Sequence, residues 1–308
     1  MKLKSIVRLV PGARQLNRAL RTMYSSQAAN TFLTFAAPGH FYSPIPDLTF
    51  VDQHKSRIFE TGLREVPGID TNETAQLNLL HEFTGYYDAI PFDDEVSSDH
   101  RYYFQNPYFS YGDGLILYSM MRHFRPRRVI EVGSGFSSAL MMDTNDEFLS
   151  GECHFTFIEP YPERLLSLMT ERDRERNRLI STMVQEVEPG EFKTLQARDI
   201  LFIDSSHVAK VGSDVVHLLT NILPVLNTGV LIHFHDIFWP FEYPEELVRM
   251  GVAWNESYML KAFLQFNSKF RILLFNSFLA IHHRALLESK VPLFLKNTGG
   301  SLWIQKIS

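Results

Sequence analysis

The chain has 308 residues, of which 21% are charged and 45% are apolar, and it carries a net charge of −5. This composition is typical of a folded protein, and the length is near the upper limit for one hydrophobic core. Because the net charge is negative, the chain has no overall basic field, and we expect no nucleic-acid partner. No apolar run reaches the roughly 18 residues that would make an integral membrane protein. The single cysteine, Cys153, cannot form an internal disulfide, which fits a cytoplasmic location.

Residues 1–105 differ in character from the rest of the chain. The first 23 residues contain six Lys and Arg residues and no acid. Such a segment can touch a membrane surface or a partner, although a mobile or surface-docked helix is the simpler explanation. Helices are expected at about 12–30 and 72–85, separated by loops rich in Pro, Asp and aromatic residues. We predict that residues 1–105 form a helical and aromatic-loop cap and residues 106–308 the main domain.

From about residue 108 the sequence alternates between helix-like and strand-like segments. Helices are expected at 108–124, 137–149, 163–179, 214–226 and 255–266, and strands at 127–133, 153–160, 180–187, 199–206, 229–237, 270–278 and 301–307. The charge run that ends the 163–179 helix is typical of a solvated face. Alternation of this kind predicts a doubly wound α/β fold with a mostly parallel sheet. In such sheets ligands bind at the carboxyl ends of the strands.

The segment "VIEVGSGFSSAL", beginning at residue 129, suits a strand, a tight turn and a helix. Gly133 and Gly135 would let the turn close tightly and the backbone approach a ligand. A dinucleotide site usually has a third glycine, which is replaced here by Ser138, and seats a pyrophosphate at the helix N-terminus. The acid Glu131 beside the turn disfavours a pyrophosphate and favours a cationic ligand. S-adenosylmethionine, with its α-ammonium and sulfonium groups, meets that electrostatic demand.

Glu159 ends the next predicted strand, 24 residues after Gly135. That spacing suits a carboxylate that accepts hydrogen bonds from two ribose hydroxyls. The simpler alternative is a structural turn with a solvated acid. The missing third glycine, together with the lack of a Tyr-x-x-x-Lys pattern, argues against a nicotinamide dehydrogenase.

Three segments, "VIEVGSGFSSAL", "FIEPYPERL" and "DILFIDSSH…LLTNILPVLNTGVLIHFHDIF", resemble class I S-adenosylmethionine-dependent methyltransferases. The resemblance covers roughly residues 108–308 and is nearest to the small-molecule branch, distantly like catechol O-methyltransferases. It implies a Rossmann-like, seven-stranded sheet whose last strand, "SLWIQKI", runs antiparallel beside "FRILLFN".

The resemblance also implies a set of cofactor-binding residues. Glu131, Gly133 and Gly135 would hold the methionine half. Gln185, or its neighbour Glu186, would lie near the adenine, and Tyr111 and Asp113 would reach the carboxypropyl end. The complete set is Tyr111, Asp113, Glu131, Gly133, Gly135, Glu159, Gln185 and Asp204.

The ends of the fourth and fifth predicted strands, "FIDSSH" and "IHFHD", bring titratable side chains to one edge of the sheet. In one hypothesis His207 or His235, oriented by Asp204 or Asp236, is a general base with a pKa near 6.5. His233, one step deeper, is typical of a core histidine.

In a second hypothesis Asp204, His235 and Asp236 bind a divalent metal. The catechol enzymes have an Asp-Asn pair where this chain has His235-Asp236, and mixed ligands favour Mn, Fe or Zn over Mg. In a third, these side chains only shape the cofactor pocket through hydrogen bonds.

Aromatic clusters at 38–47, 100–113, 237–244 and 253–258 would line a pocket for a partly apolar molecule or pack the cap onto the core. His40 and Trp239 are the candidate substrate contacts. The function predicted is methyl transfer from S-adenosylmethionine to a small-molecule acceptor, with an oxygen as the favoured acceptor atom. The alternatives are a metal-dependent oxygenase or hydrolase on the same fold, and a non-catalytic cofactor-binding scaffold.

Overall fold

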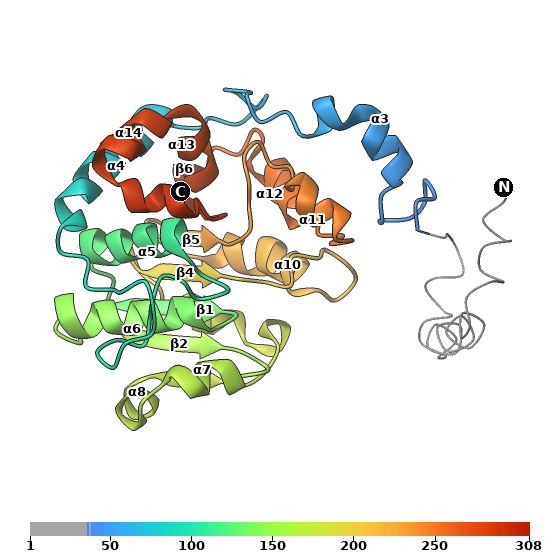
Figure 1. Cartoon of the computed structure of the whole chain (residues 1–308). Coiled ribbons are helices and arrows are strands. Elements are labelled where there is room, and N and C mark those ends of the chain that lie inside the picture. The colour runs from blue at the N-terminus through green and yellow to red at the C-terminus, as the bar shows by residue number, and fades with distance from the viewer. Residues whose placement is uncertain (1–35, 37) are drawn as a thin grey trace, which may run out of the picture. The chain divides into compact units, whose positions relative to one another are not determined.

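The computed structural model describes residue 36 and residues 38–308 (Figure 1). The helix expected at 12–30 and the basic segment before it lie outside the described residues. The described chain divides into two compact units, one of residues 36, 38–58 and 249–253 and one of residues 59–248 and 254–308. The first unit contains the helix α3, Leu48–Ile58, which the sequence pattern did not predict. A domain boundary at residue 105 stays a prediction.

The second unit is built on a seven-stranded sheet with the order β3-β2-β1-β4-β5-β7-β6. Strand β7 runs antiparallel to both of its neighbours, and the other neighbouring pairs are parallel. The strands are β1 Arg128–Val132, β2 His154–Ile158, β3 Arg178–Ile180, β4 Ile200–Ile203, β5 Leu231–Phe234, β6 Phe270–Phe275 and β7 Leu302–Lys306. This arrangement confirms the predicted Rossmann-like fold with its antiparallel last strand.

Helices cover the sheet because its central strands are apolar on both faces. Every residue of β4 and β5 is buried, as expected for strands sandwiched between helices. Helices α5 and α6 lie side by side across the near face in Figure 1. The helices of this unit are α4 Glu73–Tyr87, α5 Tyr111–Phe124, α6 Phe136–Phe148, α7 Glu163–Leu168, α8 Glu171–Arg176, α9 Pro189–Phe192, α10 Asp214–His217, α12 Glu256–Leu264, α13 Asn276–His282 and α14 Arg284–Lys290, and α11 Glu245–Arg249 ends in the first unit. None of the described helices has the length and apolar character needed to cross a membrane.

Two predicted elements have different bounds in the structure. The strand expected at 180–187 ends at Ile180, and a 3-10 turn follows at Val184–Glu186. The buried residues Val184 and Val187 are three positions apart, which fits the three-residue repeat of such a turn better than strand alternation. The helix expected at 163–179 is interrupted, because Thr170 caps a new helix: its hydroxyl accepts a hydrogen bond from the Asp173 N–H.

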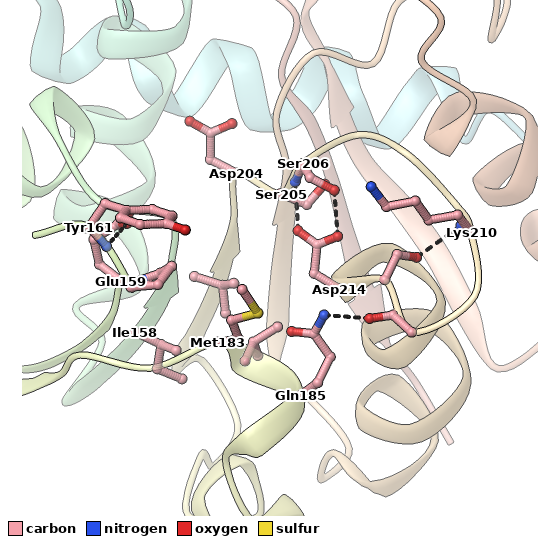
Figure 2. A pocket seen from close by; sticks show the side chains of 16 residues that line it. Ile158, Glu159, Tyr161, Met183, Gln185, Asp204, Ser205, Ser206, Lys210 and Asp214 are labelled. Atoms are coloured by element: carbon pink, nitrogen blue, oxygen red, sulfur yellow. Dashed lines mark hydrogen bonds between the residues drawn. The ribbon is translucent and has the colours of Figure 1, made fainter. Parts of the chain in front are cut away.

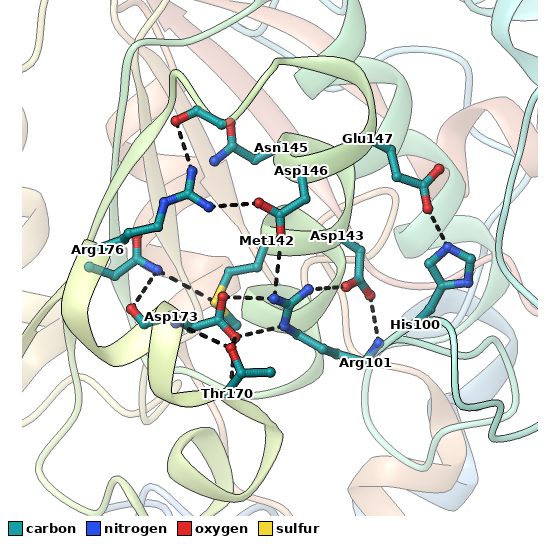
Figure 3. Close-up of polar contacts among 12 residues, drawn as sticks. His100, Arg101, Met142, Asp143, Asn145, Asp146, Glu147, Thr170, Asp173 and Arg176 are labelled. Atoms are coloured by element: carbon teal, nitrogen blue, oxygen red, sulfur yellow. Dashed lines mark hydrogen bonds and ion pairs between the residues drawn. The ribbon is translucent and has the colours of Figure 1, made fainter.

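The charge run in α8 is not simply a solvated face, because Asp173 is only 2% exposed. Its carboxylate Oδ1 lies 2.7 Å from Nη2 of Arg101, whose guanidinium also pairs with Asp143 and with Asp146 (Figure 3). The Asp143 carboxylate accepts the backbone N–H groups of Arg101 and Tyr102, both at 2.9 Å. These contacts tie the segment before α5 to helices α6 and α8.

Candidate active site

A cavity of about 470 Å³ opens where the strands β1, β2 and β4 reach their carboxyl ends (Figure 2). Four of the residues predicted from sequence line it: Gly133, Glu159, Gln185 and Asp204. Lining residues that the sequence argument did not single out include Tyr161, Met183, Lys210 and Asp214. The structure therefore brings together residues from three strand ends, as a doubly wound sheet requires.

The turn after β1 depends on one glycine. Gly133 has a left-handed backbone (φ +80°), and an added Cβ would lie 2.0 Å from the carbonyl oxygen of Asp204. Any other residue would therefore clash with the end of β4. Gly135 has an extended φ of 178°, so its conformation makes no such demand.

Glu159 is held at the cavity wall by the backbone. Its Oε2 accepts a hydrogen bond from the Ser134 N–H at 3.0 Å, and its Oε1 accepts one from the Tyr161 N–H at 2.8 Å. A carboxylate has about four acceptor positions, so two remain for ligand hydroxyls. The nearby Ser134 hydroxyl oxygen is buried and has no partner among the described residues. On the opposite wall the Gln185 side chain donates to the Gly212 carbonyl oxygen at 2.8 Å.

Glu131 is not among the residues that line the cavity, and its place beside the methionine half stays a prediction. It is fully buried, and its carboxylate accepts hydrogen bonds from the hydroxyls of Ser137, at 2.6 Å, and Ser138. Burial raises the pKa of Glu131 to about 8, although the two serines oppose the shift. Glu131 therefore contacts the first turn of α6 through these two serine hydroxyls.

Tyr111 and Asp113, expected at the carboxypropyl end, are also not among the residues that line this cavity. Tyr111 is 7% exposed and stacks on Phe104, with ring centroids 5.1 Å apart. The buried Asp113 carboxylate accepts hydrogen bonds from Ser301 Oγ at 2.6 Å and from the Gly300 N–H at 3.1 Å. Both side chains pack between α5 and the approach to β7, and their contact with the cofactor stays a prediction.

The predicted His and Asp residues do form one cluster. Asp204 Oδ1 lies 3.4 Å from His207 Nε2 and 3.4 Å from His235 Nδ1. Asp236 Oδ2 faces the same two nitrogens at 3.5 and 3.7 Å. The positive φ of 59° at His207 and 56° at Asp236 marks both loops as tightly turned.

Each imidazole is also paired on its far side with a carboxylate that the sequence argument did not assign to this role. His207 Nδ1 lies 2.9 Å from Glu256 Oε2, and His235 Nε2 lies 3.4 Å from Asp113 Oδ2. These partners are 49 and 122 residues away along the chain. No local sequence motif predicts contacts between residues so far apart along the chain.

The carboxylates reverse the expected acid–base behaviour of the histidines. Burial alone disfavours a charged imidazole, yet Asp204 and Glu256 together raise the pKa of His207 to about 10. The pKa of His235 is also raised, by Asp204 and Asp236 against the effect of burial. Burial pushes the pKa of Asp204 upward, but the two histidines hold it well below its ordinary range. The expectation of a histidine pKa near 6.5 is therefore wrong for this cluster.

A protein family described as a methyltransferase domain matches residues 130–237, which run from β1 to the residues after β5. An uncharacterized protein of Archaeoglobus fulgidus is 38% identical over 166 residues, covering 52% of this chain and 73% of that protein. The chain belongs to the class I S-adenosylmethionine-dependent methyltransferases.

Solved methyltransferase structures are similar at low identity. The SAH-bound Podospora anserina methyltransferase PaMTH1 is 15% identical, with a TM-score of 0.41 over 80% of this chain and 100% of that chain. The O-methyltransferase TomG of Streptomyces achromogenes, in complex with SAM, is 14% identical, with a TM-score of 0.42 over 84% and 96%.

Two candidate residues of this methyltransferase lie in its core. His233 is fully buried, and its ring stacks on Phe202 at 3.9 Å; burial lowers its pKa. Trp239, a predicted substrate contact, is 2% exposed and donates its indole N–H to the Leu63 carbonyl oxygen at 2.6 Å. Its ring therefore offers almost no surface to a substrate. His40, the other predicted contact, is exposed in the first unit and stacks on Phe41.

The metal hypothesis finds no support in the geometry. Among the residues that the structure describes, no group of three or more His, Cys, Asp and Glu side chains is placed to hold a metal ion. Asp204, His235 and Asp236 are instead engaged in imidazole–carboxylate pairs.

Proposed function

We propose that this methyltransferase transfers the methyl group to a hydroxyl oxygen of a small molecule, and that the His207–His235 cluster receives the proton of that hydroxyl. The observation that carries the proposal is the position of Asp204. It lines the cofactor cavity and also lies 3.4 Å from both imidazoles. One side chain therefore joins the place where the methyl group would be held to the groups that exchange protons.

In this proposal the cavity residues divide the cofactor between them. Glu159 accepts the ribose hydroxyls with its two remaining acceptor positions. Gly133 lets the backbone approach the ligand, and Gln185 lies beside the adenine. Asp204 stays ionised, because its pKa is lowered, and attracts the cationic methionine half.

The bound cofactor supplies an already activated methyl group on its sulfonium. The protein has to align the acceptor oxygen and remove its proton, and alignment is the larger contribution. With a pKa of about 10, His207 is present as free base in roughly one molecule in a thousand at pH 7. We therefore expect the rate of methyl transfer to rise about ten-fold per pH unit through the neutral range.

The cofactor assignment is tested by calorimetric titration of S-adenosylhomocysteine into the wild type, Glu159→Ala and the matched control Glu163→Ala. Glu163 is exposed at the start of α7 and does not line the cavity. We expect micromolar-range binding that is lost in Glu159→Ala and kept in the control. A wild type that does not bind would contradict the cofactor site.

The catalytic assignment is tested in a separate experiment. Methyl transfer from radiolabelled S-adenosylmethionine is followed across a panel of small phenols, alcohols, amines and carboxylic acids, with and without EDTA. Labelling of hydroxyl compounds that persists in EDTA and is lost in His207→Gln supports the proposal. Labelling confined to amines would refute the oxygen acceptor, and activity restored only by added Mn²⁺ would favour the metal hypothesis.

A further inference from the structure

A second cavity, of about 660 Å³, lies at the opposite end of the sheet from the cofactor cavity. It is lined by residues at the amino ends of β1 and β4, and it shares no lining residue with the first cavity. Four arginines belong to its wall: Arg125, Arg127, Arg128 and Arg198. We call this the arginine pocket.

No acidic side chain neutralises these four arginines within the described part of the chain. Asp199, the one acid in the lining, is 5% exposed. Its Oδ1 accepts the backbone N–H groups of Arg127 and Arg128 at 3.0 and 2.9 Å, and its Oδ2 accepts that of Gln196 at 2.8 Å. It is therefore committed to holding the backbone between the two strands.

The guanidinium groups retain most of their hydrogen-bonding capacity. Arg125 donates to the Phe148 carbonyl oxygen at 3.1 Å, and Arg128 donates to the Thr194 carbonyl oxygen at 3.2 Å. Neither contact neutralises a charge, and each guanidinium has five N–H groups. Because the chain as a whole carries a net charge of −5, this concentration of unpaired positive charge is local.

The backbone adds an independent observation. Arg125 caps α5 with a φ of +47°, and Arg198 precedes β4 with a φ of +75°. Glycine and asparagine adopt this left-handed region at lower cost, and glycine is the usual residue at the end of a helix. Two of the four arginines therefore occupy positions where backbone conformation alone would favour another residue.

We propose that the arginine pocket binds a small molecule that carries two or three linked phosphate groups. Planar guanidinium groups pair with phosphate oxygens through two parallel hydrogen bonds, and several arginines match the three to four negative charges of a di- or triphosphate. The volume of about 660 Å³ falls within the range of small-molecule sites. The proposal does not depend on the methyl acceptor.

The test is calorimetric titration of inorganic pyrophosphate into the full chain in a buffer free of phosphate. Wild type is compared with the double variant Arg127→Gln/Arg198→Gln and with the control Arg178→Gln/Arg284→Gln. The control removes two exposed arginines that pair with Glu191 and Glu288 elsewhere. We expect pyrophosphate to bind at least about ten-fold more weakly to the pocket variant, and unchanged to the control.

A second titration locates the binding. Pyrophosphate is titrated into protein saturated with S-adenosylhomocysteine, which we expect to leave its affinity unchanged. Thermal unfolding of all variants is the check on folding. We expect each variant to unfold at the wild-type temperature, because the replaced arginines are exposed. The proposal is overturned by a wild type that does not bind pyrophosphate, by equal losses in pocket and control variants, or by competition with the cofactor product.

Discussion

Glu256 and His207 form the tightest contact of the cluster, with Oε2 and Nδ1 2.9 Å apart. Glu256 is 1% exposed, and its other oxygen, Oε1, has no partner among the described residues. A carboxylate so placed fixes the orientation of the imidazole and stabilises its charged form. Glu256 is therefore a positioning residue that acts through His207.

Replacing Glu256 with glutamine keeps its shape and removes its charge. We expect the pKa of His207 to fall by at least about one unit, because an opposite charge in direct contact is lost. Nitrogen-15 NMR titration of the histidines measures this without a known acceptor. Glu82→Gln, at an exposed position of α4, is the control. An unchanged His207 titration would show that Glu256 has no influence on its protonation.

Glu131 gives a second residue-level prediction. Its folded-state pKa of about 8 lies above the unfolded value near 4.5, so the folded state holds a proton that the unfolded state releases. Its contribution to stability is therefore complete below pH 4.5 and is lost as the pH rises through 8. Glu131→Gln should not show this loss. Between pH 5 and pH 8 the free energy of unfolding of the wild type should therefore fall by about 2 to 4 kcal/mol more than that of the variant.

Urea unfolding at both pH values measures the difference. Glu152→Gln, on an exposed loop before β2, should follow the wild type at both pH values. If Glu131→Gln and wild type show the same change between the two conditions, Glu131 is already ionised in the folded protein.

At the scale of single elements, the Arg101 network joins a loop to two helices. The side chains of Asp143 and Asp173 are 2% and 3% exposed, so removing Arg101 leaves two buried carboxylates without their cation. We expect Arg101→Met to lower the free energy of unfolding by about 3 to 5 kcal/mol. Arg178→Met, which breaks the more exposed pair with Glu191, should cost less than about 1 kcal/mol. Similar losses in urea unfolding for both variants would contradict the special role of Arg101.

The sequence predicted the main strands because buried parallel strands are continuous apolar runs. It failed at β3, where three residues are too short for a periodic signal, and at α8, where burial of Asp173 depends on a cation 72 residues away. The cavity residues Gly133 and Glu159 were predictable, because their roles follow from a local turn and a strand end. Glu256 was not, because only the tertiary fold brings α12 beside the end of β4.

At the scale of the whole molecule, the cluster makes stability depend on pH. The pKa of His207 is about 10 in the folded state and near 6.5 when unfolded, so its contribution is complete below pH 6.5 and is lost as the pH rises through 10. His233 acts in the opposite sense, because burial lowers its pKa and its contribution is lost as the pH falls below 6.5. Stability should therefore decrease on the alkaline side even after Glu131 has ionised.

We expect the wild type to lose at least about 2 kcal/mol of unfolding free energy between about pH 8 and 9.5, which is the slope of the one proton held by His207. The double variant His207→Gln/Glu256→Gln replaces both partners by neutral amides, so no buried charge is left unpaired, and its loss should be smaller. His81→Gln, at an exposed position of α4, should behave as wild type. Urea unfolding between pH 8 and 9.5 measures these losses. If the free energy of unfolding changes equally with pH in the double variant and in the wild type, His207 is not the group that retains the proton.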